Sequence, residues 1–270
     1  MNNTKIDWCD MSWNPVTGCQ QDCDYCYANR IAVRFGGTVN TCPTGNLHVL
    51  NEPFVAEKND YNDTPRRNPY PYMFDPTFHR YRLTDPVQVK LPQTIFVCSM
   101  GDLFGEWIPE EWIKSIITVC ASAHWHRYLF LTKNPRRYDE VIEYIEGTDS
   151  PLTTRGLSAH FGVTAADEKQ LYAAYETQAT WLSIEPIQEN MRNGFENCAV
   201  IHRPYDGAEL ARWGWVVIGA ETGSRKEKVV PERKWIEEIV DILKFWKTPI
   251  YMKRNLVSIW GEELIQELPW

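Results

Sequence analysis

From about residue 94 onward, short apolar runs alternate with segments that have the spacing of amphipathic helices. Near-continuous apolarity over a short run is typical of strands that are buried on both faces of a parallel sheet. The runs are Thr94–Cys98, Tyr128–Thr132, His160–Thr164, Trp181–Glu185, Trp215–Gly219 and Ile250–Lys253. Repeated alternation of strands and helices predicts βαβ units.

Three helices are predicted between these runs. One begins at Pro109, one follows Pro135, and one covers about residues 232–246. A first strand near Met11–Asn14 brings the number of strands to about seven, which is enough for a full or partial (β/α) barrel. A doubly wound open sheet is the alternative. The 270 residues are expected to form a single α/β domain.

Residues 40–93 interrupt this pattern. They are rich in Asn, Pro and Tyr and show no convincing periodicity. A segment of this length without regular structure is usually a functional loop or an insertion. We expect an insertion that covers the mouth of the barrel as a lid.

Charge and hydropathy limit the cellular setting. The chain has no apolar run long enough to cross a membrane and no basic-then-apolar leader, which predicts a cytoplasmic protein without a membrane partner. The net charge is −8, and an acidic chain is not typical of a nucleic-acid binder. Contact with nucleic acid would therefore need a local basic patch.

The strongest chemical signal is a cluster of three cysteines. Cys19, Cys23 and Cys26 have the spacing C-x3-C-x2-C, with Tyr25 before the last cysteine. Three thiolates on one loop can ligate three irons of a [4Fe–4S] cluster and leave the fourth iron open to a ligand. A structural zinc site with Cys9 or Cys42 as fourth ligand is the alternative, and simple buried cysteines are a third interpretation.

The cysteine triad and its aromatic neighbour, placed after a first strand and before a β/α series, resemble the radical S-adenosylmethionine (SAM) superfamily. Within it, the chain is similar to a phage- and prophage-associated family. The segments that carry the resemblance are Lys5–Trp8, Trp13–Cys19, Tyr25–Ala28, Phe78–His79, Arg82–Leu83, Ile95–Phe104, Leu131–Pro135, Leu182–Pro186, Gly219–Gly223 and Lys253.

The resemblance implies a partial (β/α)6-7 TIM-like barrel of the radical SAM type, with the cluster at the carboxyl ends of the strands and the insertion after the cluster loop. Cys19, Cys23 and Cys26 would hold the [4Fe–4S] cluster. An external electron donor of the flavodoxin or ferredoxin type would supply one electron. SAM would then be cleaved to methionine and a 5′-deoxyadenosyl radical that abstracts a hydrogen from the substrate.

The same resemblance suggests residues that bind SAM. Tyr25 would pack near the adenine, and Thr164 would contact the ribose. Ser99, Gly101 and Asp102 occupy the place of a Gly-Gly-Glu segment that holds the methionine end of SAM in the superfamily. Polar residues at strand ends are also common as helix caps, which is the structural alternative.

Three charged residues end strand-like runs. Glu185, Glu221 and Lys253 are expected to point into the barrel mouth and to act in catalysis, and surface salt bridges are the alternative. Cys98 also ends a run, either as an inward thiol or as a buried structural cysteine.

A basic and aromatic stretch lies within the insertion. Between residues 64 and 82, four arginines accompany a single carboxylate, that of Asp75. Arginine interleaved with aromatic residues suits phosphate contact and base stacking, so Arg66, Arg67, Arg80 and Arg82 are candidate nucleic-acid contacts. A solvated loop with aromatics packed on the barrel is the alternative.

The expected function is a radical SAM reaction on a modified thymine base in phage DNA, in the host cytoplasm. The base would be rearranged or functionalised, and the isomerase or mutase, lyase and transferase classes stay open. Repair of a damaged thymine, as in spore photoproduct lyase, is the enzymatic alternative. A zinc-stabilised nucleic-acid-binding protein without catalysis is the alternative from another class.

Overall fold

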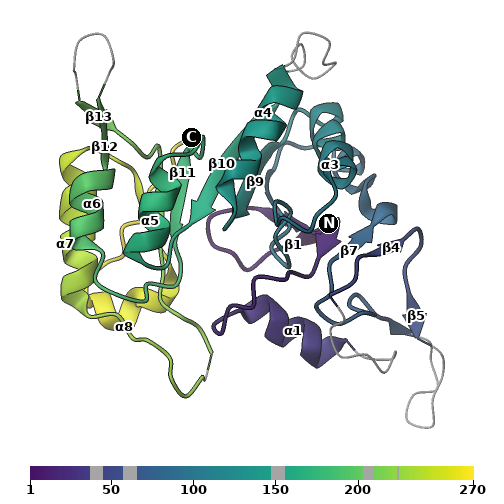
Figure 1. Ribbon diagram of the computed structural model, residues 1–270, viewed down its shortest axis with the longest axis horizontal. Helices are drawn as coiled ribbons and strands as arrows, with labels where there is room; N and C mark the ends of the chain where they lie inside the picture. Colours follow the sequence, from purple (N-terminus) through teal and green to yellow (C-terminus); the bar gives the residue numbers. More distant parts are fainter. Residues whose placement is uncertain (37–44, 57–65, 147–155, 203–208, 224) are drawn as a thin grey trace. The chain divides into compact units, whose positions relative to one another are not determined.

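The computed structural model describes residues 1–36, 45–56, 66–146, 156–202, 209–223 and 225–270 (Figure 1). The chain has a mixed α/β fold and divides into two compact units, which are described separately. Unit 1 consists of Met1–Phe130 and Glu140–Ala159, and unit 2 consists of Leu131–Asp139 and His160–Trp270.

The strands of unit 1 follow the order β1-β2-β8-β9. Their bounds are Asn2–Asn3, Met11–Trp13, Thr94–Val97 and Arg127–Thr132. Strand β1 is antiparallel to β2, whereas β2, β8 and β9 are parallel to one another. Trp13 pairs with Val97, so the segments that follow these two residues leave the sheet at the same end.

Five helical segments belong wholly or largely to unit 1. They are α1 Tyr27–Phe35, η1 Arg80–Arg82, α2 Asp85–Gln88, α3 Glu110–Ser122 and α4 Tyr138–Glu146. Ile113, Ile116, Ile117 and Cys120 of α3 are all buried, which confirms the apolar helix face expected after Pro109.

The described part of residues 40–93 contains regular structure, so the expectation of an irregular insertion is wrong there. Its strands are β4 His48–Leu50, β5 Val55–Ala56, β6 Arg66–Arg67 and β7 Thr77–His79. Strand β3 (Val16–Thr17) pairs with β7, and β7 pairs with β4. Strands of two or three residues are too short to show periodicity in a sequence. The role of the segment as a lid stays a prediction.

Unit 2 contains four parallel strands in the order β10-β11-β14-β15. They are Ser158–Thr164, Trp181–Ile184, Val216–Ile218 and Ile250–Met252. Thr164 pairs with Ser183, Ser183 with Val217, and Val217 with Tyr251. The residues that follow the strands therefore leave this sheet together.

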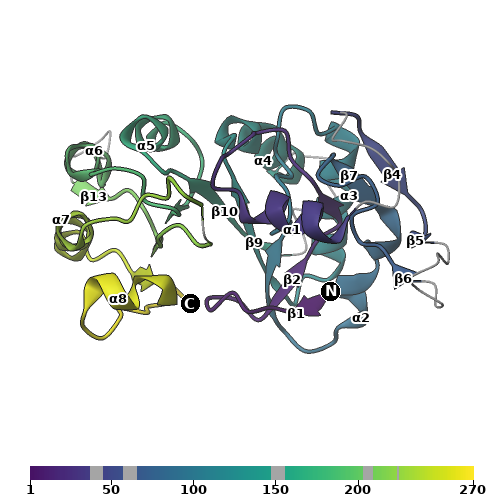
Figure 2. The same ribbon diagram turned by 90° about the horizontal axis from the view of Figure 1, so that it is seen from below.

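Helices and a hairpin complete unit 2. The helical segments are η2 Pro135–Arg137, α5 Glu168–Tyr175, α6 Arg192–Cys198, α7 Arg233–Phe245, η3 Arg254–Leu256 and α8 Val257–Trp260. Strands β12 Val200–His202 and β13 Glu209–Ala211 form the hairpin. Helix α6 packs between α5 and α7 (Figure 2).

The predicted apolar runs match β8, β9, β10, β11, β14 and β15, and the three predicted helices match α3, α4 and α7. The parallel arrangement is thus confirmed within each unit, whereas closure into a barrel and the single-domain organisation stay predictions. Within the described ranges, every helix falls short of the length and apolarity that a bilayer span requires.

Candidate functional site

The three cysteines lie on the loop that joins β3 to α1, and Cys26 is the N-cap of α1. The sulfur of Cys26 accepts a hydrogen bond from the backbone N–H of Asn29 at 3.3 Å, and the sulfur of Cys19 accepts one from Gln21 at 3.4 Å. Backbone donors and a helix N-terminus both stabilise the negative charge of a thiolate. The loop therefore presents three sulfur atoms as candidate metal ligands, two of them with backbone donors.

Cys19, Cys23 and Cys26 are all half-buried. Burial raises the pKa of the Cys19 thiol, and the nearby carboxylate of Asp102 raises it further. Cys19 therefore carries a proton in the free protein, and a bound metal would displace that proton.

The donor set fits an iron–sulfur cluster better than a single metal ion. A zinc ion needs its ligands to converge on one point at about 2.0–2.3 Å, whereas each cysteine of a cluster binds a different iron. Among the described residues, no three His, Cys, Asp or Glu side chains converge in that way. Cys42, the suggested fourth zinc ligand, lies outside the described residues.

Backbone contacts on two sides position the cysteine loop. Gly18 has φ +88°, and a Cβ atom there would lie 2.2 Å from the carbonyl oxygen of Asp75. Its N–H donates to the carbonyl of Met100 at 2.9 Å, and the N–H of Cys19 donates to that of Phe74 at 3.0 Å. Only glycine fits this close approach, because any side chain would overlap the backbone.

The turn after β8 lies directly against this loop. Cys98 has φ +58°, in the left-handed region, and its carbonyl accepts the N–H of Gly101 at 3.1 Å. A Cβ atom on Gly101 would lie 2.6 Å from the carbonyl oxygen of Gly18. The structure thus brings the predicted SAM-binding segment and the cysteine loop together.

Two of the predicted SAM-binding residues hold this turn in shape. The hydroxyl of Ser99 donates to Oδ1 of Asn14 at 3.2 Å, and the same oxygen accepts the N–H of Met100 at 3.0 Å. The carboxylate of Asp102 is buried, and its Oδ1 accepts the N–H of Phe104 at 3.0 Å. These bonds give both residues a structural role beside their predicted one.

Asn14 and Tyr27 were not among the candidate site residues, yet both contact this turn. Asn14 follows β2 and supplies the oxygen that joins two residues of the turn, whereas the hydroxyl of Tyr27 donates to the carbonyl of Ser99 at 2.5 Å. Their positions are the signal that could have identified them, since Asn14 directly follows a strand and Tyr27 directly follows the last cysteine. Tyr25, the predicted adenine contact, is half-buried in the loop.

Cys98 is a buried structural thiol. It is 4% exposed, and burial raises its pKa to about 12. A buried thiol held in this neutral form is a poor nucleophile at physiological pH.

A buried histidine joins the insertion to the strand that precedes the cysteines. His79 in β7 is fully buried, and its Nε2 lies 2.9 Å from the hydroxyl of Thr17 in β3. Burial, followed by the positive charge of Arg82, lowers the pKa of His79 to about 3. His79 is therefore neutral, and it supports the cysteine loop from the insertion side.

The four candidate arginines occupy different settings. Arg66 and Arg67 form β6, Arg67 is exposed, and Arg80 is exposed with its guanidinium 5.8 Å from the centroid of the Phe78 ring. Arg82 is half-buried and donates from Nη1 to the carbonyl of Asn14 at 2.8 Å. Arg82 thus holds Asn14, a residue of the site, in place from inside the protein. Its position in a basic stretch of the sequence had suggested a surface role.

Unit 2 has its own cluster of polar groups at the ends of its strands. Lys253 after β15 forms an ion pair with Glu185 after β11, and Gly219 after β14 leaves room for both side chains. Thr164 and Ser183 are buried on adjacent strands, and the Ser183 hydroxyl has no hydrogen-bond partner among the described residues. Glu185 and Lys253 thus form a salt bridge, which was the alternative to their predicted catalytic role, and that role stays a prediction.

Glu221, the third predicted catalytic residue, is held by an arginine. Its buried carboxylate accepts hydrogen bonds from Nε and Nη2 of Arg225 at 2.9 and 2.8 Å. A bidentate pair of this kind fixes both side chains. The carboxylate is thus neutralised by Arg225.

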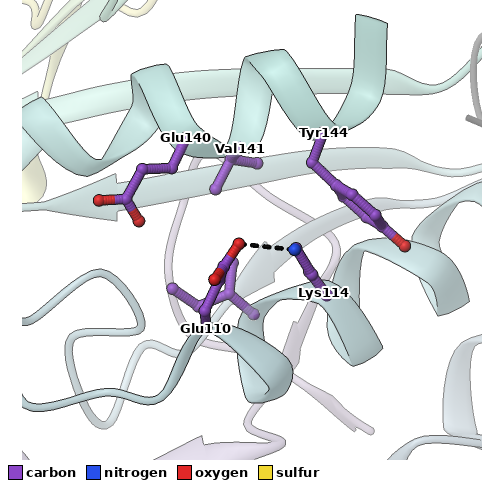
Figure 3. A pocket seen from close by; sticks show the side chains of 6 residues that line it. Glu110, Lys114, Glu140, Val141 and Tyr144 are labelled. Carbon is purple, nitrogen blue, oxygen red and sulfur yellow. Dashed lines mark ion pairs between the residues drawn. The ribbon is translucent and has the colours of Figure 1, made fainter. Parts of the chain in front are cut away.

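A small surface pocket between α3 and α4 lies in unit 1 (Figure 3). Glu110 and Lys114 of α3 form an ion pair at 2.6 Å, and the Lys114 ammonium lies 5.1 Å from the centroid of the Tyr144 ring of α4. These contacts lie within α3 and between α3 and α4, so they hold the two helices together. None of the residues that line the pocket belongs to the cysteine loop.

The family described as "Protein of unknown function (DUF5131)" matches residues 3–264. The chain belongs to this family. No curated protein matches the DUF5131 chain significantly.

Solved structures with a similar fold are those of spore photoproduct lyase. Its complex with dinucleoside spore photoproduct has a TM-score of 0.54 at 10% identity, and a cysteine-to-serine variant has 0.53 at 12%. A variant with bound AdoMet and dinucleoside spore photoproduct has 0.53 at 9%. Each match covers 93% of the DUF5131 chain and 78% of the lyase chain. The DUF5131 chain therefore shares the fold of this lyase.

Proposed function

We propose that this DUF5131 protein is a radical SAM enzyme that acts on a thymine-derived base in DNA. The observation that carries the proposal is the placement of Cys19, Cys23 and Cys26 on one half-buried loop at the N-terminus of α1. The fold shared with spore photoproduct lyase supports it, because that lyase has been solved with AdoMet and a dinucleoside photoproduct. The phage association stays a prediction from the sequence resemblance.

In this proposal the three cysteines hold a [4Fe–4S] cluster. When bound, the cluster would supply one electron to SAM and so generate a 5′-deoxyadenosyl radical. The protein keeps the loop in place through Gly18 and through the backbone contacts of Cys19. Asn29 and Gln21 direct their backbone N–H groups at two of the sulfurs, where they would stabilise the negative charge of a metal-bound thiolate.

The SAM-binding role falls to the turn after β8 and to the cysteine loop. Ser99, Gly101 and Asp102 lie on the turn that packs against Gly18, so we propose that they contact the methionine end of SAM. A carboxylate such as Asp102 suits the positive amino group of that end. Tyr25 and Thr164 are the proposed contacts of the adenine and the ribose.

We assign substrate contacts to the polar groups at the strand ends of unit 2. Glu185 and Lys253 are 24% and 21% exposed, so the pair can exchange its partners for polar groups of a base. Glu221 is fixed by Arg225 and would act as a positioning group. A base inside a duplex cannot reach a buried radical, so the target must be extruded or single-stranded. The exposed Arg67 and Arg80 would contact phosphates.

Anaerobic purification followed by metal analysis tests the cluster. We expect a brown protein with about four irons per chain that cleaves SAM to 5′-deoxyadenosine when reduced with dithionite. Replacing Cys19, Cys23 or Cys26 by Ala should abolish cleavage and lower the iron content. Cys9→Ala and Cys198→Ala serve as controls and should retain both. A colourless protein that binds one zinc ion would contradict the proposal and favour the nucleic-acid-binding alternative.

Deuterium transfer tests the substrate class. Oligonucleotides that carry deuterated thymine, a spore-photoproduct-type lesion or a modified thymine are incubated with the enzyme and SAM, and 5′-deoxyadenosine is analysed by mass spectrometry. We expect deuterium transfer from one of these strands and more transfer from single-stranded than from duplex DNA. Equal transfer from the free nucleoside would shift the assignment to a small-molecule substrate.

A further inference from the structure

We propose that the exposed face of α1 is the docking site for the electron donor, a small acidic redox protein. This α1 face consists of Tyr27, Arg30, Val33 and Arg34, with Phe35 at its end. The inference rests on the proposed function, because only a protein that uses a reducible cluster needs such a partner. At the interface the donor loses one electron and the cluster gains it, so no bond forms or breaks there.

The location of α1 gives the first argument. The helix begins at Cys26, and its nine residues rise by about 1.5 Å each, so every part of the α1 face lies within about 14 Å of this cysteine along the helix axis. Its opposite side is anchored, since Ala28 and Ala32 are buried with Phe74 and Met100. Figures 1 and 2 show α1 at the outside of unit 1, with no other described helix or strand of this unit over its outer side.

The apolar exposure of this helix gives the second argument. Tyr27, Val33 and Phe35 are 43%, 47% and 58% exposed. Large apolar side chains of a helix usually face the core, so this exposure is unusual. Position 30 is three residues from 27 and from 33 and four residues from 34, so these positions lie around one side of the helix. A contiguous exposed group of aromatic, aliphatic and arginine side chains is typical of the centre of a protein interface.

Charge gives the third argument and indicates the partner. The whole chain has a net charge of −8, yet Tyr27–Phe35 contains two arginines and no Asp or Glu. Each of the other described helices of at least eight residues, α3, α4, α5 and α7, contains at least one carboxylate. The exposed carboxylates of Asp22 and Asp24 precede the helix on the cysteine loop, so the positive charge is confined to α1 itself. A cationic helix face on an acidic protein attracts an acidic partner and guides its approach.

A redox protein fits the α1 face better than DNA does. Only two cations are present, and they surround exposed Val33 and Phe35 side chains, which offer nothing to a phosphate backbone. The Arg34 guanidinium lies 5.3 Å from the centroid of the Phe35 ring, so part of its charge already faces an aromatic ring. Such a mixed surface suits a short-lived contact with a folded acidic protein.

The experiment separates donor docking from cluster chemistry. The variant Arg30→Glu/Arg34→Glu reverses the charge of the α1 face, and Lys234→Glu/Lys244→Glu changes net charge equally on exposed positions of α7. Reduced flavodoxin or dithionite serves as the electron source, and SAM cleavage and cluster reduction, followed by absorbance, are measured. Binding of oxidised flavodoxin is measured by calorimetry and needs no turnover.

We expect the α1 variant to bind flavodoxin at least about tenfold more weakly and to be reduced by it more slowly, with little remaining dependence on salt. Its iron content and dithionite-driven cleavage should equal those of the wild type. Arg30→Gln/Arg34→Gln should show a smaller effect in the same direction, and the α7 variant none.

Three results would overturn the docking proposal. One is an unchanged flavodoxin affinity and rate in the α1 variant, and another is an equal loss in the α7 variant. The third is an α1 variant that no longer binds a labelled single-stranded oligonucleotide but is reduced normally by flavodoxin. This result would assign the α1 face to DNA. Failure of the proposed function itself looks different, because the wild type would then lack dithionite-driven SAM cleavage.

Discussion

Lys253 and Glu185 form an ion pair across the end of β14, the strand that lies between theirs. Gly219 directly follows β14 between them, and a Cβ atom there would lie 3.1 Å from Cδ of Lys253 and 3.4 Å from Cγ of Glu185. The lack of a side chain at 219 therefore gives the ion pair its room. Residues from three separate strands thus combine into one polar site.

Gly219→Ala should displace this ion pair. The new methyl group would enter the space that both side chains use, so we expect substrate conversion to fall about tenfold or more while substrate-independent SAM cleavage is retained. Lys253→Met should have a similar effect, and Lys234→Met on exposed α7 should have none. Product formation and 5′-deoxyadenosine are quantified in the same reaction. Normal conversion by both Gly219→Ala and Lys253→Met would remove the pair from the substrate site.

Asp102→Asn should weaken SAM binding without changing the iron content. The substitution keeps the size of the side chain and removes the charge proposed to face the amino group of SAM. Asp10→Asn is the matched control, because each of these two carboxylates accepts a backbone N–H in unit 1. Equilibrium binding of SAM to the cluster-loaded protein is the measurement. Equal SAM affinity in both variants would return Asp102 to a purely structural role.

Gly18→Ala should destabilise the cysteine loop. A left-handed conformation costs an ordinary residue about 1–2 kcal/mol, and the overlap with the Asp75 carbonyl adds to this cost. Gly156 has φ +62°, with no described atom near its Cβ position, so Gly156→Ala carries only the conformational cost. Urea unfolding and iron content are compared. If the two variants lose equal stability and keep their iron, the close approach at Gly18 is unimportant.

Because His79 stays neutral in the folded protein, the free energy of unfolding should decrease as the pH falls below about 7. Its pKa is about 3 in the folded protein and about 6.5 in an unfolded chain, so between these values the unfolded chain binds the extra proton. The free energy of unfolding then decreases as pH falls, by at most about 1.4 kcal/mol per pH unit. His79→Gln stays neutral and should flatten this slope between pH 7 and 5.5, measured by urea unfolding. An unchanged slope would assign the acid sensitivity to other groups.

Reversing Arg67 and Arg80 to Glu should weaken DNA binding and reduce its salt dependence, because both side chains are exposed. SAM cleavage without substrate should continue. Arg82→Glu should instead lower stability, since Arg82 donates to the carbonyl of Asn14. Fluorescence anisotropy with a labelled oligonucleotide measures the binding. Unaltered binding by Arg67→Glu/Arg80→Glu would leave the basic stretch without a role in DNA contact.

Long periodic elements were predictable from the sequence, whereas short ones were not. The buried strand β8 reads as an apolar run and was predicted at nearly its true bounds, and the start of α3 was predicted within one residue. Strand β7 has three residues, and its pairing with β3 depends on partners far away in the chain. Local patterns contain no information about such pairing.

The candidate site was predictable in its residue types but less so in its contacts. The cysteine spacing singled out three candidate ligands, which the structure places on one loop. The ends of the strands singled out Ser99, Asp102, Glu185 and Lys253, whose roles stay predictions. Asn14 and His79 were missed as site residues because their roles come from hydrogen bonds to residues far away in the chain, such as Ser99 and Thr17. Arg82 resembled a surface cation, although its guanidinium is used inside the protein.

The support of the cysteine loop by β7 has a consequence for biosynthesis. Thr17 and His79, which join the two strands, are 62 residues apart, so the cysteines leave the ribosome before the strand that supports them. At about 5–20 residues per second, the delay is roughly 3 to 12 seconds. During this time the three thiols belong to a nascent chain without their final loop. Cluster delivery is therefore expected after the segment through β7 has been synthesised, and oxidation of the thiols before that point would compete with maturation.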